Sequence, residues 1–112
     1  MNIQIFGKSK SFDTKKAERW FKERRIRYQY IDLSSKGVSP GEYRSLRAAV
    51  GSFDALVDKT CRAYEEQYMA YITPQAAEEK LLACPELFAA PIVRNGRQAT
   101  VGYRPEVWQT WE

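Results

Sequence analysis

The chain has 112 residues, of which 44% are hydrophobic and 29% are charged, and its formal net charge is +4. This balance is typical of a single folded domain and excludes a disordered or membrane-spanning chain, because no apolar run is long enough to cross a bilayer. Histidine is absent, which excludes Ser-His-Asp triads and Cys-His pairs and argues against zinc sites.

The two cysteines and the N-terminal residues indicate the cellular compartment in which the protein is expected. Cys61 and Cys84 lie in unrelated contexts and match neither a disulfide framework nor a metal motif. The N-terminus alternates between polar and apolar residues and lacks the basic and apolar regions of a secretory signal. We therefore expect a cytoplasmic protein, one domain over residues 1–112, with no bound metal or cofactor and no membrane contact.

Residues 1–33 predict a strand, a helix and a second strand. Polar and apolar side chains alternate over residues 2–6 and again over residues 27–33, the period of a half-buried strand. Between them, Ala17, Trp20 and Phe21 recur at helical spacing, so a helix of about three turns should begin at Asp13 or a neighbour. A helix between two strands favours a parallel pair with a right-handed crossover.

The middle of the chain is predicted to be helical. Ser39-Pro40 combines an N-cap residue with proline at the first helical position, and opens a helix that ends at Gly51. Thr73-Pro74 repeats this signal for a helix that ends before Pro85. Residues 52–57 predict another short helical turn.

The last part of the chain predicts a hairpin and a short helix. Asn95-Gly96 lies between two β-rich runs, which is a strong hairpin signal. Arg104-Pro105 opens a final helix with Val107, Trp108 and Trp111 on its packing face.

These elements predict an α/β domain with a thioredoxin-like order: β-α-β, a helical insert, then β-β-α. The four-stranded mixed sheet should be built from residues 2–6, 28–33, 91–94 and 98–102. The hydrophobic core is expected to contain Ile3, Ile5, Ala17, Trp20, Phe21, Ile31, Leu46, Leu81, Leu82, Ile92, Val93 and Val101.

From end to end, the chain resembles the arsenate reductase/Spx (ArsC) family. The resemblance is carried by GKSKSFDTKKAERWFKERRI, by the Gly51 region and ALVDKTCRAY, by APIV with its NG turn, and by VGYRPEVW. It implies a thioredoxin-like fold and a glutaredoxin-type thiol-redox lineage whose members reduce arsenate or disulfides. Relatives in this family use glutathione with glutaredoxin, or thioredoxin, as the reductant.

The family places its redox cysteine in the first loop, where the N-terminus of the first helix stabilises a thiolate. That position falls on Ser11 here, and Thr14 stands where some members carry a second cysteine. A serine hydroxyl has a far higher pKa than a thiol and forms no reversible disulfide, so the expected nucleophile is missing. Three interpretations of Ser11 stay open: a naturally degenerate site, a deliberate replacement of cysteine, and a helix-capping hydroxyl with no catalytic history.

The resemblance also implies arginines that bind arsenate. One precedes a proline that is expected to be cis, and this pair reads Ala90-Pro91 here. A second position is occupied by Asp58, and only the third, Arg104, matches. Because the nucleophile and two of these arginines are absent, we do not expect arsenate reductase activity. In this fold the cis proline presents the preceding backbone to the active-site loop, where an extended partner could pair with it.

The first loop is still expected to bind anions weakly, because helix N–H groups point into it. The side chains expected to contribute are Lys8, Lys10, Ser11, Thr14 and Arg104. The alternative is that Asp13 caps the helix itself and leaves no room for a ligand.

Two classes of function follow. The first is a thiol-redox protein that is inactive or altered at Ser11, and the second is a non-enzymatic Spx-like regulator that binds a redox protein or transcription machinery such as RNA polymerase. Cys61, beside Arg62, is a minor candidate for a substitute redox thiol, whereas Cys84 should be buried at the end of an apolar helix. Residues 1–27 carry a net charge of +6, but no recognition motif accompanies it, so we expect a solvated helix face and no nucleic-acid binding.

Overall fold

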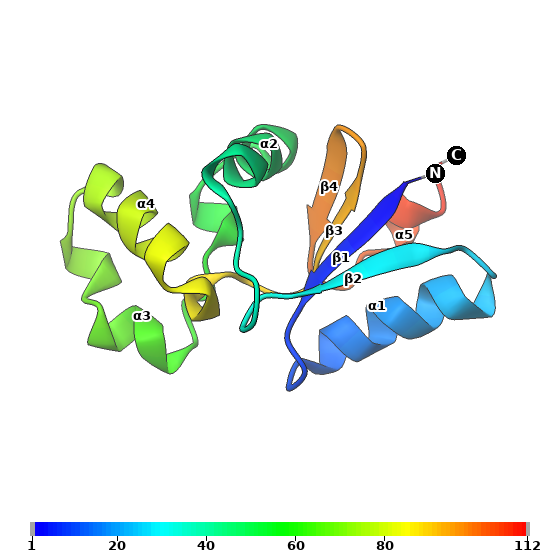
Figure 1. Cartoon of the computed structure of the whole chain (residues 1–112), viewed down its shortest axis with the longest axis horizontal. Coiled ribbons are helices and arrows are strands. Elements are labelled where there is room, and N and C mark those ends of the chain that lie inside the picture. Colours follow the sequence, from blue (N-terminus) through cyan, green and yellow to red (C-terminus); the bar gives the residue numbers. More distant parts are fainter. Residues whose placement is uncertain (1, 112) are drawn as a thin grey trace.

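The structure, a computed structural model, describes residues 2–111. In this part of the chain, four strands and five α-helices follow one another (Figure 1). Their order is β1 (Ile3–Gly7), α1 (Phe12–Glu23), β2 (Tyr28–Asp32), α2 (Pro40–Val50), α3 (Arg62–Glu66), α4 (Pro74–Ala83), β3 (Ile92–Asn95), β4 (Gln98–Val101) and α5 (Pro105–Trp108). Short 3₁₀ turns cover Asp54–Leu56, Met69–Tyr71 and Pro85–Leu87.

The strands form one mixed sheet in the order β2-β1-β3-β4. β1 runs parallel to β2, as the crossover through α1 requires, and β3 is antiparallel to both β1 and β4. This confirms the predicted thioredoxin-like order, with strand bounds within about a residue of those expected.

Two hydrophobic clusters lie on opposite faces of the sheet. On one face, Ile3, Ile5 and Val93 pack against α1 and α5, where Trp20, Phe21 and Trp108 contact one another edge to face or tilted. On the other face, Phe6, Ile31 and Ile92 pack against α2 and the rest of the insert. Figure 1 shows the insert extending away from the sheet, and the molecule is accordingly elongated, with extents of 42 × 26 × 23 Å.

The predicted helix starts are confirmed by their caps. Ser39 accepts a hydrogen bond from the backbone N–H of Glu42, whose carboxylate accepts one from Ser39 in return. Thr73 caps α4 in the same way through the N–H of Ala76, and Gly51 ends α2 with a φ of 100°. These local signals position the two long helices of the insert.

The core prediction needs two corrections. Leu82 and Val101 are only half-buried and pack at the edge of the insert-side cluster, whereas the other predicted core residues are buried. Leu82 belongs to an α4 helix whose buried positions are Ala77 and Leu81, and Val101 lies in an edge strand with one open side. The hairpin turn also falls one residue later than the Asn-Gly pair, because Asn95 still pairs with Gln98.

The short helix α3 was not located from the sequence. It has five residues, and its N-cap position, Cys61, makes no side-chain capping bond. Neither periodicity nor a capping signal marks so short an element. No helix among residues 2–111 combines the length and the apolar character that crossing a membrane requires.

Candidate functional site

The loop between β1 and α1 lies at the carboxyl ends of the two parallel strands. Leu33, just after β2, donates its N–H to the carbonyl oxygen of Gly7 at 3.0 Å, so both strands end side by side. This edge of a parallel pair is where α/β proteins commonly bind ligands. The geometry of residues 8–14 therefore decides what the site can do.

Ser11 is the N-cap of α1. Its Oγ accepts the backbone N–H of Thr14 at 3.1 Å, and its own N–H donates to the carbonyl oxygen of Lys8 at 3.0 Å. The capping role belongs to Ser11 and not to Asp13, which was the alternative considered from the sequence. The hydroxyl thus occupies the position at which a thiolate would receive a helix N–H.

The Thr14 side chain is buried within the loop between β1 and α1. It is 1% exposed, and its Oγ1 accepts the backbone N–H of Lys8 at 3.4 Å. A Cβ added to Gly7 would lie 2.4 Å from the Thr14 methyl group, so β1 and α1 approach closely only because residue 7 is glycine. Thr14 therefore packs within the loop, and the expectation that its hydroxyl faces an anion does not fit this burial.

Lys8 points toward the helical insert and is neutralised there. Its Nζ lies 3.7 Å from Asp58 Oδ2 and donates a hydrogen bond of 2.7 Å to the carbonyl oxygen of Glu86. Burial by itself would raise the pKa of Asp58, but hydrogen bonds from Thr60 and the charge of Lys8 hold it below its usual value. Asp58 stands where the resemblance expects an arginine, so a carboxylate now faces the loop.

The other two predicted cations, Arg104 and Lys10, differ in their partners. Arg104 precedes α5 and donates from its Nε to Glu106 Oε1 at 2.7 Å, and both side chains are exposed. Lys10 is exposed and has no ion-pair or hydrogen-bond partner within residues 2–111. Of the side chains expected to hold an anion, only Lys10 is left uncompensated.

The Ala90–Pro91 peptide bond is cis, as expected. Just before it, Ala89 donates its N–H to the carbonyl oxygen of Leu56 at 2.8 Å, and Asp58 donates to that of Leu87 at 2.8 Å. Pro91 is buried, and its carbonyl oxygen accepts from Gly102 at 2.8 Å. Between these bonds, the backbone of Ala90 has no backbone partner among residues 2–111.

The two cysteines have different surroundings. Cys61 is half-buried, and its Sγ lies in hydrogen-bond contact with the carbonyl oxygen of Asp58 at 3.2 Å. Cys84 was expected to be buried, but it is half-exposed because α4 ends there and Pro85 turns the chain back toward β1. It lines a hollow of about 490 Å³ together with Lys8, Ser9, Lys10, Ser34, Ala83, Pro85 and Glu86.

Sequence reasoning placed Asp58 at a position where the resemblance expects an arginine, but it missed that Asp58 pairs with Lys8 and that Cys84 lies beside the loop. Both residues belong to the insert, far along the chain from the loop. The turn at Cys84-Pro85 was the one signal that could have indicated this return of the chain.

Comparison with known proteins identifies the fold. No protein-family model and no curated protein matches the chain. Among solved structures, an ArsC-family-related protein from Bacteroides fragilis superposes with a TM-score of 0.89 at 19% identity, covering 100% of this chain and 98% of its own. An arsenate reductase from Vibrio cholerae gives 0.85 at 22% identity, with 96% and 94% covered. An arsenate reductase-related protein from Brucella melitensis gives 0.72 at 19%, with 99% and 94% covered. The chain thus has the fold of arsenate-reductase-type proteins over its whole length.

Proposed function

We propose that this protein derives from the thiol-redox lineage of the arsenate reductase/Spx family and does not carry out redox catalysis at Ser11. The observation that carries this proposal is that the Ser11 Oγ caps α1 by accepting the Thr14 N–H at 3.1 Å. A hydroxyl in this place keeps the shape of the loop without providing a sulfur that can be oxidised or form a mixed disulfide.

The charges around the loop support the loss of arsenate reduction. An oxyanion substrate needs guanidinium or ammonium groups that remain unpaired. Here Lys8 is compensated by Asp58, and Arg104 is compensated by Glu106. Anion binding at this loop is therefore proposed to be weak and to depend mainly on Lys10 and the helix N–H groups.

A second candidate is the binding of a protein partner, a redox protein or transcription machinery such as RNA polymerase. The observation that favours it is that the backbone of Ala90, directly before the cis Pro91, has no backbone partner in the described part of the chain. An extended segment of another chain could form backbone hydrogen bonds there, in the manner of an added strand. The proposed setting for either role is the cytoplasm, where glutathione, glutaredoxin and thioredoxin would be the available reductants.

Activity assays test the proposal about Ser11. We expect wild-type protein to reduce neither arsenate nor glutathione-linked disulfides above the rate of buffer with glutaredoxin or thioredoxin present. The control is a variant with Cys61→Ser and Cys84→Ser. Turnover that persists in this control would overturn the proposal about Ser11, whereas turnover lost in it would assign the chemistry to one of these cysteines.

Binding is measured separately, by titrating labelled protein with thioredoxin or with RNA polymerase and following the amide signals of Ala89 and Ala90. Shifts at Ala90 that appear without any turnover would support the binding role. Unchanged signals with both partners would contradict it.

A further inference from the structure

A row of polar side chains crosses the insert-facing side of the sheet. Gln4 on β1 pairs in register with Gln29 on β2 and with Arg94 on β3. Residues paired in register share a face of the sheet. Side chains alternate along a strand, and Ile3 and Ile5 pack against α1, so Gln4 faces the insert. Gln4 Nε2 also donates to Gln29 Oε1 at 3.3 Å. This polar row lies near the start of β1, at the other end of that strand from the Ser11 loop.

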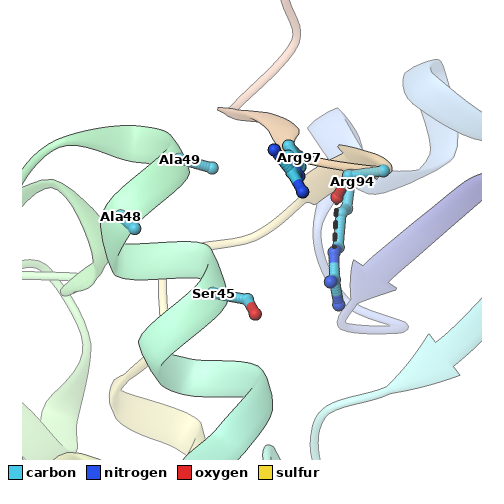
Figure 2. A pocket seen from close by; sticks show the side chains of 6 residues that line it. Ser45, Ala48, Ala49, Arg94 and Arg97 are labelled. Atoms are coloured by element: carbon cyan, nitrogen blue, oxygen red, sulfur yellow. Dashed lines mark hydrogen bonds between the residues drawn. The ribbon is translucent and has the colours of Figure 1, made fainter.

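α2 lies beside this polar row but leaves hollows between its own side chains and the sheet. Toward the hairpin, α2 presents the short side chains of Ser45, Ala48 and Ala49, as Figure 2 shows. Together with Arg94, Gly96 and Arg97 they line a hollow of about 240 Å³. A second hollow of about 380 Å³ contains Gln4 and Gln29 and extends to Lys36 and Glu42. Because Arg94 and Gln4 are cross-strand neighbours, residues of the two hollows lie side by side along the polar row. We call the two hollows together the groove.

The hairpin end of the groove is positively charged and uncompensated. Arg94 uses its Nε to donate to the carbonyl oxygen of Gly96 at 3.0 Å, so its two terminal nitrogens have no partner within residues 2–111. Arg97 is exposed and forms no ion pair with any described residue. No carboxylate lines this hollow, and the only one in the second hollow, that of Glu42, accepts the N–H of Ser39 at 3.1 Å.

We propose that this groove binds a small phosphate monoester. The phosphate would lie between the guanidinium groups of Arg94 and Arg97, and the neutral part of the ligand would lie along Gln4 and Gln29. Three phosphate oxygens can accept hydrogen bonds from two guanidinium groups at once, whereas one arginine suffices for a carboxylate. A polynucleotide fits less well, because no aromatic side chain lines either hollow to stack a base.

Amide-resolved NMR titration with glycerol 3-phosphate, inorganic phosphate and succinate tests the proposal. We expect glycerol 3-phosphate to bind most tightly and to shift the signals of Gln4, Ala48 and Gly96. Binding of succinate as tight as that of glycerol 3-phosphate would overturn the phosphate assignment. Shifts confined to residues 8–14 would place the site at the Ser11 loop and overturn the groove.

Matched variants make the test specific. Arg94→Gln and Arg97→Gln should each weaken glycerol 3-phosphate binding about tenfold, the loss expected for one charge-assisted hydrogen bond. Arg19→Gln, an equal charge loss at an exposed position of α1, should leave it unchanged. Ala48→Leu fills the hollow while keeping both arginines, and should abolish binding in a protein with unchanged thermal stability. Equal affinity in wild type and the Arg94→Gln, Arg97→Gln double variant would refute the site.

Discussion

Replacing Ser11 by cysteine should create a thiol with a strongly lowered pKa. The wild-type Oγ already accepts the N–H of Thr14 at 3.1 Å, at the N-terminus of a twelve-residue helix. A thiolate in this place would receive the same N–H and would lie on the positive end of the helix dipole. Both interactions favour the charged form over the neutral thiol.

The size of the shift follows from these two contributions. A hydrogen bond to a charged acceptor contributes about 1.5–3 kcal/mol, and the helix terminus contributes about 0.3–1 kcal/mol. Since one pKa unit corresponds to about 1.4 kcal/mol, the thiol pKa should fall by about 1.5–3 units from its ordinary value of about 8.5. The nearby Lys8–Asp58 pair adds little, because its two charges offset each other.

The assay is the rate of alkylation by iodoacetamide as a function of pH. It uses a background in which Cys61 and Cys84 are replaced by serine, so that only the new thiol reacts. Ser9→Cys is the matched control, since Ser9 is exposed in the same loop but does not cap the helix. We expect a pKa of about 5.5–7 for Ser11→Cys and about 8.5 for the control. Values within half a unit of each other would refute the reasoning.

Three further substitutions, one of them with a matched control, probe the loop and the core by urea denaturation. Gly7→Ala should destabilise the fold by about 1–3 kcal/mol, because the added Cβ would meet α1. Gly41→Ala is the control and should be neutral or slightly stabilising, because nothing lies within 4 Å of the added Cβ. Equal effects of the two substitutions would contradict the close approach of β1 and α1. Asp58→Asn should cost up to about 1 kcal/mol at pH 7 by unpairing Lys8. Because the pKa of Asp58 is lowered in the folded state, this difference should be present above pH 3.8 and vanish as the pH falls further; a constant difference would show that charge is not the cause. Phe21→Ala should cost about 3–5 kcal/mol, and a loss below about 1 kcal/mol would mean that α1 does not pack on the sheet as described.

The order of the elements could be predicted from the sequence because each signal is local. Caps such as Ser39-Pro40 and Thr73-Pro74 act within one helical turn, and strand alternation acts between neighbouring residues. The right-handed crossover then leaves few ways to arrange two parallel strands and a hairpin. The resemblance across the whole chain led to the same fold.

The candidate site could be predicted only in part. Ser11 was correctly placed at the start of α1, since a helix start is itself a local feature. Two of the side chains expected to bind an anion are ion-paired instead, and the helix and strand signals do not determine such partners. Lys8 meets Asp58, 50 residues along the chain in the insert, and Arg104 meets Glu106, only two residues away.

The sequence by itself determined the order of the strands and of the longer helices, and that the loop holds a hydroxyl where a thiol would be expected. The tertiary structure alone decided that Asp58 compensates Lys8, that Cys84 opens onto the loop, and that Gln29, Gln4 and Arg94 form one row. The physical reason is that strand register and the return of the insert bring together residues far apart along the chain, such as Gln4 and Arg94, which are 90 positions apart. Such pairings are set by the packing of the two sheet faces, and no local pattern encodes them.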